Sequence, residues 1–560
     1  MTRSSFLLLA GAIASLQLAH TADATEKPDA GLGQIPLPDE PGFPGQQSVL
    51  VYADASNSAG NCTHDSDLLV KTTLFTVQGA VSPETPKVRQ FLGIPFAQPP
   101  IGRLRFRPPV TKVATNEIVD ATKYGPYCFQ HTPARSAIFS DYFPGHQFVA
   151  GQVESEDCLT LDIWAPRKGC GDDGQQQART PVGDKAVLIW IHGGALMTGD
   201  SSPPYTRGSK MVEAHQDAVV VSINYRVNIF GFPGAAALDG RKLNPGFLDV
   251  RMAVEWVYQN IHYFGGSPTQ MIIFGDSAGS SCVDKYIHAW AHDPIIKGGI
   301  MMSGQGELSA DPNDHSNFDY VADKLGCIGD KNKQFTCMQQ VGAKEIAHVL
   351  NTYDSKRNDG NVLIFQPQAD NETSFSNYTD LQARGLYATV PQIIGNCNNE
   401  FASLITPFNK DGADQQVLDR LSDGMFICPA AKAARARQEF GSPIWRYRYF
   451  GEWPNSNPLP WLHAYHGSDI AMVFGTADTY EPNTPQQTAI SEYMQSVWVE
   501  FAKDPENALT EKFGWPKYVA HEDTLVRLAY ENNPKPTFVK GDMYDKGCGG
   551  PPIVWPIKEL

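Results

Sequence analysis

A serine between two glycines, directly after an apolar run, is the feature that most limits what this chain can fold into. Residues 275–279 read Gly-Asp-Ser-Ala-Gly and follow the apolar segment 271–274, while residues 280–290 contain neither glycine nor proline. A strand that reverses sharply into a helix leaves little room for side chains at the turn. The pattern therefore predicts a nucleophile elbow with Ser277 at its tip. The alternative is an ordinary turn in a chain with 49 glycines.

Apolar runs bounded by glycine or proline recur along the chain, and helical patterns lie between several of them. The runs span residues 186–191, 218–223, 271–274, 299–302 and 391–394. Strands buried on both faces are continuously apolar, and their alternation with helices indicates a mainly parallel sheet covered on both sides. Functional residues in such a sheet follow the carboxyl ends of strands. His192, Ser277 and Glu400 all occupy such positions.

A serine hydroxyl becomes a good nucleophile when a neighbouring imidazole takes its proton, and the imidazole needs an acid that fixes its tautomer. In a strand–elbow–helix architecture the chain order is serine, acid, histidine. With Glu400 as the acid, the histidines beyond it are His463, His466 and His521. A Gly-Ser-Asp loop follows His466 and could carry it over the sheet. The residues favour His466, with His463 as the main alternative.

A glycine pair at 193–194 follows the apolar run 186–191. Backbone N–H groups that point to the developing negative charge stabilise the tetrahedral intermediate of acyl transfer. Glycine lets the backbone approach a ligand closely. Ala278 adds another N–H at the positive end of the predicted helix. These residues predict an oxyanion hole; a flexible turn is the alternative.

The amino-terminal residues have the layout of a secretory signal: Arg3, an apolar run over 6–18, and small residues near 24. No later stretch has the length and apolarity of a membrane helix. We expect a signal peptide at 1–24, an extended Pro/Gly-rich arm at 25–67 and one domain at 68–560, in a secreted protein without a transmembrane anchor. Export would expose the glycosylation motifs at Asn61, Asn371 and Asn377.

These motifs, together with several others in the same order, resemble the type B carboxylesterase family of α/β-hydrolases, which includes cholinesterases and secreted fungal lipases and esterases. The resemblance covers roughly residues 68–516 and implies a large, mostly parallel sheet with helices on both faces. The matching stretches are 91–97, 103–109, 155–159, 192–195, 224–226, 244–249, 264–266, 275–279 and 466–469.

The resemblance assigns roles to matching positions. It implies a catalytic triad of Ser277, Glu400 and His466. It implies oxyanion donors at the amides of Gly194, Ala195 and Ala278. It also implies two structural ion pairs, Arg105 with Glu156 and Arg226 with Asp249, and two disulfides, Cys128 with Cys158 and Cys327 with Cys337. Six cysteines stay unassigned: Cys62, Cys170, Cys282, Cys397, Cys428 and Cys548.

The expected reaction is hydrolysis of hydrophobic carboxylic esters through an acyl-enzyme, with no metal or organic cofactor. The loop 129–157 contains five aromatic residues and no tryptophan, so a dedicated choline ester is not expected. The five are Phe129, Phe139, Tyr142, Phe143 and Phe148. Core packing is the alternative role for some of these rings.

Two alternatives differ from a soluble-ester esterase. A triacylglycerol or sterol-ester lipase with a lid would use the same motifs. An inactive adhesion protein of this family would lack a triad residue, whereas this chain has all three. A net charge of −16 argues against nucleic acid as a partner and leaves a small-molecule ester or lipid.

Overall fold

The computed structural model describes residues 67–131, 153–167, 183–238, 242–306, 310–353, 363–405, 409–479 and 481–549. Within these ranges, one sheet of eleven strands runs through the molecule in the order β14-β13-β12-β11-β10-β9-β7-β8-β6-β4-β3. Its strands are β3 (Ala80–Val81), β4 (Val88–Pro95), β6 (Thr160–Pro166), β7 (Lys185–Ile191), β8 (Ala218–Ile223), β9 (Gly266–Asp276), β10 (Gly298–Met302), β11 (Gln392–Cys397), β12 (Ile444–Tyr449), β13 (Leu525–Leu528) and β14 (Thr537–Val539).

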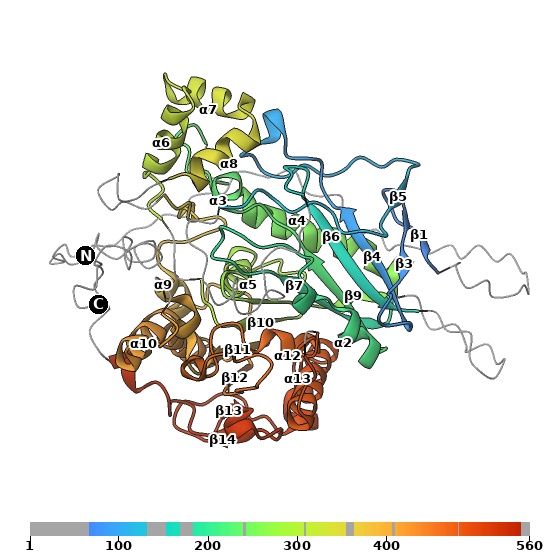
Figure 1. Cartoon of the computed structure of the whole chain (residues 1–560), viewed down its shortest axis with the longest axis vertical. Coiled ribbons are helices and arrows are strands. Elements are labelled where there is room, and N and C mark those ends of the chain that lie inside the picture. Colours follow the sequence, from blue (N-terminus) through green and yellow to red (C-terminus); the bar gives the residue numbers. More distant parts are fainter. Residues whose placement is uncertain are drawn as a thin grey trace, which may run out of the picture.

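The central strands of this sheet, from β8 to β13, pair in parallel, and antiparallel strands flank them at both edges. In Figure 1 the blue and green strands of the amino-terminal half lie above the orange and red strands of the carboxyl-terminal half. All five apolar runs lie in or overlap central strands, namely β7, β8, β9, β10 and β11. The predicted mainly parallel sheet is confirmed.

Side chains alternate between two hydrophobic cores, one on each face of the sheet. Along β7, Val187, Ile189 and Ile191 enter one core, whereas Leu188 and Trp190 enter the other. The first core contains side chains of α4 (Pro245–Asn260) and α5 (Ala278–Ala289). The second contains side chains of α2 (Ser209–Ala214), α12 (Ile470–Phe474) and α13 (Pro485–Lys503). Helices therefore cover both faces, as predicted.

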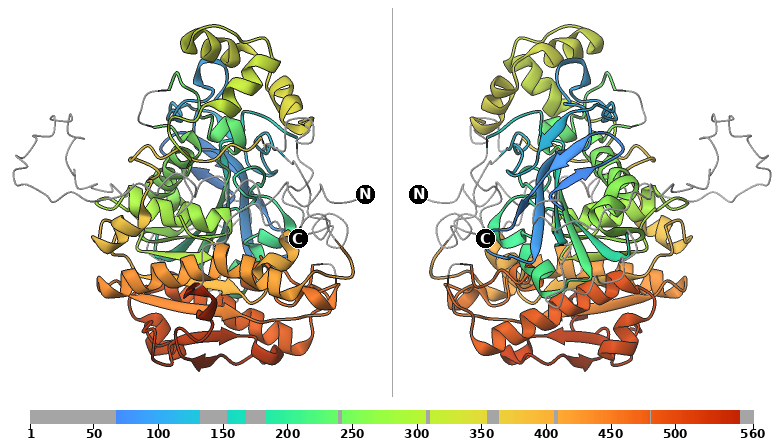
Figure 2. Two further views of the ribbon diagram at one scale, coloured as in Figure 1. Left: turned by 90° about the vertical axis from the view of Figure 1, so that its left-hand side faces the viewer. Right: turned by 90° about the vertical axis from the view of Figure 1, so that its right-hand side faces the viewer.

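The remaining elements surround this body. A separate three-stranded sheet joins β1 (Leu69–Lys71), β2 (Thr76–Gln78) and β5 (Ile118–Asp120). The other helices are α3 (Asn228–Gly231), α6 (Ser316–Lys324), α7 (Lys331–Gln340), α8 (Ala343–Asn351), α9 (Tyr378–Ala383), α10 (Gln415–Ser422), α11 (Cys428–Glu439) and α14 (Ala508–Phe513). Figure 2 shows α6 to α8 at the opposite end of the molecule from β13 and β14.

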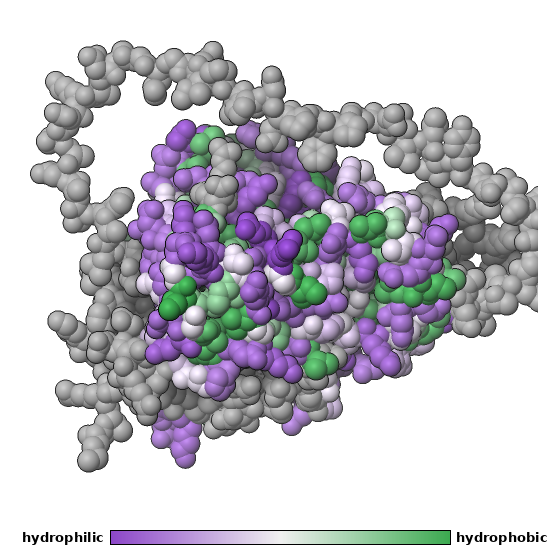
Figure 3. Space-filling view, turned by 90° about the horizontal axis from the view of Figure 1, so that it is seen from above, coloured by the Kyte–Doolittle hydropathy of each residue, from purple (hydrophilic) through white to green (hydrophobic). Residues whose placement is uncertain are grey.

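The surface at the α6–α8 end is mixed in character. Seen from above, small hydrophobic groups lie among hydrophilic side chains (Figure 3). No helix within the described ranges combines the length and apolarity needed to cross a bilayer.

Three disulfides join described cysteines. Cys128 bonds Cys158 and Cys327 bonds Cys337, each with an S–S distance of 2.00 Å. A third, Cys428–Cys548, ties the carboxyl-terminal segment to α11 across 120 residues. Cys282 and Cys397 are free and buried, whereas Cys62 and Cys170 lie outside the described residues.

The two ion pairs implied by the sequence are present. Arg105 contacts Glu156 through two nitrogens, each 2.6 Å from a carboxylate oxygen. Arg226 binds Asp249 in the same forked way at 2.7 Å, and both side chains are almost fully buried. A charge-assisted pair with two parallel hydrogen bonds fixes orientation as well as distance. The Arg226–Asp249 pair thereby joins the segment after β8 to α4.

Candidate active site

The turn between β9 and α5 holds Ser277 in a strained backbone conformation. Its φ is 58° and its ψ −121°, and a non-glycine residue in such a sparsely populated region costs about 1–3 kcal/mol. The Ser277 N–H donates to the carbonyl of Met302, at the end of β10, at 2.9 Å. Ser277 is half-buried. Such strain persists only where the surrounding structure enforces it.

Close backbone packing provides that enforcement. A Cβ atom on Gly279 would lie 2.0 Å from the Ile191 carbonyl oxygen, and one on Gly275 would lie 2.7 Å from the same atom. No side chain fits at such distances, so α5 can begin directly against the carboxyl end of β7 only with glycine at both positions. This contact is the physical reason for the two glycines that flank the serine.

Glu400 and His466 form a short, buried hydrogen bond. The Nδ1 atom of His466 lies 2.6 Å from Oε2 of Glu400. The other carboxylate oxygen, Oε1, accepts the backbone N–H of Cys397 at 2.7 Å, so both oxygens of Glu400 are engaged. Glu400 is fully buried and His466 is 5% exposed. The ring orientation of His466 is thereby set by the carboxylate.

The backbone brings these two side chains together. Asn399 and Tyr465, the residues immediately before Glu400 and His466, form a parallel bridge, and the Asn399 N–H donates to Ala464 at 2.8 Å. The side-chain amide of Asn399 also donates to the Leu462 carbonyl at 3.1 Å. The loop after β11 and the loop before α12 are therefore fixed to each other one residue away from the acid and the imidazole.

The second ring nitrogen of His466 faces the elbow. Nε2 is buried, has no hydrogen-bond partner among the described residues, and lies 3.9 Å from Oδ2 of Asp276, the residue before Ser277. Burial would lower the pKa of His466, but the carboxyl groups of Asp276 and Glu400 outweigh burial and raise that pKa to about 9. Burial also raises the pKa of Asp276 well above its usual range.

The other two candidate histidines lie at the surface. The side chain of His463 is 46% exposed and its Nδ1 lies 3.1 Å from Glu452. His521 is 85% exposed at its side chain and pairs with Asp542 at 2.8 Å. Neither histidine shares the buried arrangement of His466 and Glu400.

The glycine turn after β7 lies against the serine. A Cβ on Gly193 would lie 3.2 Å from Cβ of Ser277. The turn continues through Gly194, Ala195 and Leu196, all with positive φ (106°, 57° and 58°). The amides of Gly194, Ala195 and Ala278 donate no hydrogen bond to any described residue. Three unused N–H groups therefore belong to the two turns that meet at Ser277.

Tyr225 supports this turn, a role that the sequence did not assign. Its hydroxyl donates to the carbonyl of His192 at 2.9 Å, and its ring stacks on the His192 ring at 4.3 Å. Burial lowers the pKa of His192 to about 4, so this imidazole is neutral at neutral pH. The Asn-Tyr-Arg motif at 224–226 was visible in the sequence, but the contact depends on tertiary structure.

Two further side chains bind the far side of the same turn. Gln130 accepts the Gly199 N–H at 2.6 Å and donates to the Gly199 carbonyl at 3.3 Å, as a neighbouring strand would. Asn228 donates to the Phe129 carbonyl at 2.6 Å, and its own N–H donates to Leu196 at 2.6 Å. Together with Tyr225, these side chains hold the backbone of the turn at residues 192, 196 and 199. Neither Gln130 nor Asn228 was singled out in the sequence.

The remaining predicted positions lie as follows. Asn371 and Asn377 are exposed, and Asn61 lies outside the described residues. Phe129 is 5% exposed and stacks on Phe230 at 5.4 Å, so this ring packs in the core. The other four aromatic residues of the loop 129–157 lie outside the described ranges. Among the side chains the structure describes, no group of three His, Cys, Asp or Glu could hold a metal ion.

Comparisons with known proteins show the family to which this chain belongs. The model of the Carboxylesterase family matches residues 66–414 and 406–545. The chain is 37% identical over 492 residues to secreted lipase 5 of Gibberella zeae, covering 83% of this chain and 90% of that protein. It is 35% identical over 495 residues to the chlorogenic acid esterase of Aspergillus niger, covering 85% and 93%. It is 28% identical over 480 residues to the para-nitrobenzyl esterase of Bacillus subtilis, covering 80% and 91%. The chain is therefore an enzyme of the carboxylesterase family and has the α/β-hydrolase fold.

Proposed function

We propose that this chain is a secreted serine hydrolase that cleaves hydrophobic carboxylic esters, with Ser277, Glu400 and His466 as its catalytic triad. The observation that carries the proposal is the buried Glu400–His466 hydrogen bond of 2.6 Å, whose imidazole presents a free nitrogen beside the strained elbow. This arrangement supplies a nucleophile, a base and a group that orients the base.

The residues act in two half-reactions. His466 Nε2 takes the Ser277 proton as the hydroxyl oxygen attacks the ester carbonyl, and Glu400 stabilises the resulting imidazolium. The amides of Gly194, Ala195 and Ala278 bind the oxyanion. The imidazolium gives its proton to the departing alcohol, which leaves an acyl group on Ser277. A water molecule, deprotonated by His466, then attacks the acyl group, releases the carboxylic acid and restores the serine.

The relatives support the substrate class and the location. A lipase and two esterases are among them, and one is named as secreted. Three disulfides suit an oxidising compartment. The lipase relative makes a lipid ester the second candidate substrate. A lipase would differ from an esterase of soluble esters in that its hydrolysis rate increases when the substrate exceeds its solubility limit. The buried Glu400–His466 hydrogen bond and the strained elbow at Ser277 argue against an inactive adhesion role.

His466→Ala should abolish turnover of 4-nitrophenyl butyrate, lowering kcat by at least about 10³-fold, because the general base is lost. His463→Ala is the matched control, since His463 is three residues away and exposed. It should keep kcat within about twofold. Steady-state kinetics on folded proteins, checked by circular dichroism, provide the measurement. If His463→Ala is the inactive variant and His466→Ala is active, the assignment of the base is wrong.

The raised His466 pKa predicts a pH dependence. The base works only in its neutral form, so kcat/KM should fall on the acid side, about tenfold per pH unit, with an apparent pKa above the ordinary imidazole value of about 6.5. The measurement is kcat/KM for the same ester between about pH 5 and about pH 10. An acid limb centred well below 6.5 would contradict the influence assigned to the Asp276 and Glu400 carboxyl groups.

Tyr225→Phe should lower kcat by about tenfold with little change in KM. The variant keeps the ring but leaves the buried His192 carbonyl without its hydrogen-bond donor. The lost hydrogen bond costs about 1–3 kcal/mol and loosens the glycine turn that carries the Gly194 and Ala195 amides. Donors to the oxyanion act in the transition state, so kcat should carry the effect. Tyr286→Phe is the control: Tyr286 is buried on α5, but its hydroxyl binds Arg251. Equal effects of both variants, or a change confined to KM, would exclude the role.

A further inference from the structure

The segment that follows β10 forms part of the wall of the elbow. A Cβ on Gly304 would lie 2.3 Å from the carbonyl oxygen of Ser277, so the two backbones are in direct contact. Ser277 also donates its N–H to Met302, at the end of β10. Residues 303–306 therefore lie next to the nucleophile at the carboxyl edge of the sheet.

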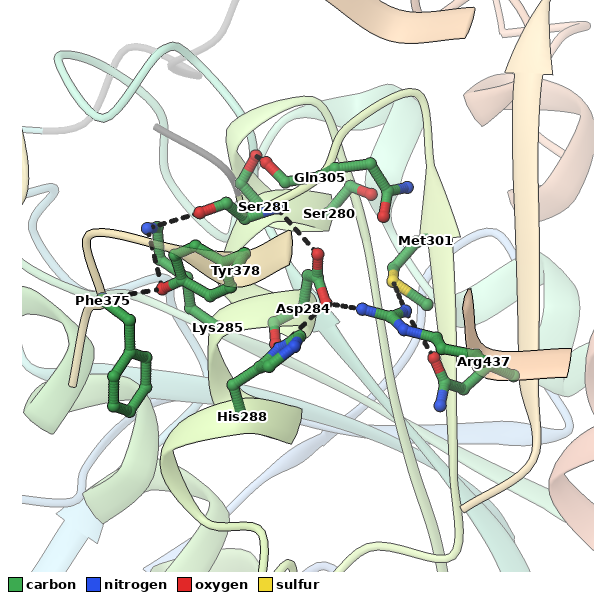
Figure 4. A network of polar contacts seen from close by, with 12 residues as sticks. Ser280, Ser281, Asp284, Lys285, His288, Met301, Gln305, Phe375, Tyr378 and Arg437 are labelled. Atoms are coloured by element: carbon green, nitrogen blue, oxygen red, sulfur yellow. Dashed lines mark hydrogen bonds and ion pairs between the residues drawn. The ribbon is translucent and has the colours of Figure 1, made fainter. Parts of the chain in front are cut away.

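Four contacts from polar side chains of α5 hold the backbone of this segment. Figure 4 shows these side chains, Ser280, Ser281, Asp284 and Lys285, together with Gln305. Each donor or acceptor is a polar side chain of α5 within 2.7–2.8 Å of a backbone atom: Ser280 donates to the Gly304 carbonyl, Ser281 to the Gln305 carbonyl, Lys285 to the Gly306 carbonyl, and Asp284 accepts the Gly306 N–H. The backbone on both sides of Gln305 is thus fixed.

The side chains that provide these contacts are themselves held in place. Asp284 pairs with Arg437 of α11, which donates to Gln392 of β11 at 2.6 Å. Lys285 donates to the Tyr378 hydroxyl of α9 at 3.1 Å. Asp284 and Arg437 are fully buried. The network joins α5, α9, α11 and β11, so residues 304–306 rest on a rigid support.

The Gln305 side chain is the exception in this network. It is 6% exposed, yet neither its Oε1 nor its Nε2 has a hydrogen-bond partner among the described residues. In Figure 4 the Gln305 side chain extends away from Lys285 and past the amino-terminal end of α5, which carries Ser280. This helix begins one residue after Ser277. A buried amide without partners costs about 1–3 kcal/mol per lost hydrogen bond. Native structures keep few such groups, and a binding role is one explanation for them.

An unpaired buried amide is not by itself a binding site. Gln382 of α9 is 1% exposed and also lacks partners for both amide atoms among the described residues. What distinguishes Gln305 is its place on a segment that touches Ser277 and whose backbone is immobilised by four hydrogen bonds. An unpaired amide on a fixed segment that touches the backbone of the nucleophile is suited to a group on a bound ester.

We propose that Gln305 determines specificity: its buried amide hydrogen-bonds a hydroxyl group carried by the ester substrate next to the scissile bond. The proposal rests on the proposed function and adds a polar element to an otherwise hydrophobic substrate. An amide both donates and accepts, and a hydroxyl group does the same, so one hydroxyl can satisfy both amide atoms. A site whose buried polar group is left unpaired rejects the analogue that lacks the hydroxyl.

The test compares esters that differ only by a hydroxyl group. One set varies the acyl side, methyl benzoate against its three monohydroxylated isomers. The other varies the alcohol side, benzyl acetate against the three hydroxybenzyl acetates. In each pair, kcat/KM is measured for the wild type and for Gln305→Met, which keeps the length of the side chain and removes both polar atoms. The ratio between wild type and variant cancels the intrinsic reactivity of each ester.

The wild type should favour at least one hydroxylated ester, and Gln305→Met should lower kcat/KM for that ester about tenfold or more while leaving the parent ester within about threefold. Whether the sensitive ester belongs to the acyl or the alcohol set identifies the pocket. Gln382→Met is the matched control and should change neither ester. If Gln305→Met does not fold, Gln305→Leu replaces it.

Two results would overturn the proposal. One is an equal change for the parent and every hydroxylated ester, which would make Gln305 structural. The other is unchanged kinetics throughout. Failure of the proposed function looks different, because the wild type would then hydrolyse no ester in either set.

Discussion

The contact between the start of α5 and the end of β7 is the constraint on which the rest of the site depends. Gly275 and Gly279 both pack on the Ile191 carbonyl, and Ser277, in the tight turn between them, has a strained backbone conformation with a φ of 58°. Hydrophobic burial offsets the strain energy, because β7, β9 and α5 bury apolar side chains in the same core on one side of the sheet. The stability of a large sheet is thereby used to hold one hydroxyl group, and glycine at two positions makes that possible.

Three central strands contribute to the site through the segments that follow them. β7 leads to the glycine turn, β9 to the serine, and β11 to Glu400, while the loop before α12 adds His466. Parallel pairing places all the carboxyl ends at one edge, and a backbone bridge at Asn399 and Tyr465 brings the last loop to the same place. Polar side chains buried behind the turns, such as Tyr225 and Asp284, then fix backbone atoms rather than substrate.

Continuous apolar runs made the central sheet predictable, and the small residues around Ser277 indicated the turn. The strand β12 was missed because Arg446 and Arg448 interrupt its apolar character; Arg446 is buried by pairing with Asp545, about a hundred residues away. The residues alone left three histidines as candidates for the base, since only tertiary structure separates a buried imidazole from exposed ones. Gln130 and Gln305 lacked any sequence signal, and the motif at 224–226 did not reveal the role of Tyr225, because each of the three acts through a contact that the fold creates.

The central claim is that Ser277 is the one activated hydroxyl of this chain. The most direct measurement is reaction with a fluorophosphonate, an organophosphorus reagent that loses fluoride and phosphonylates serine nucleophiles activated by an adjacent base, followed by mass spectrometry of the digested protein. The account predicts a single phosphonylated residue, Ser277, loss of activity in proportion to labelling, and no labelling of Ser277→Ala. Labelling of another serine, or full activity after Ser277 is labelled, would contradict it.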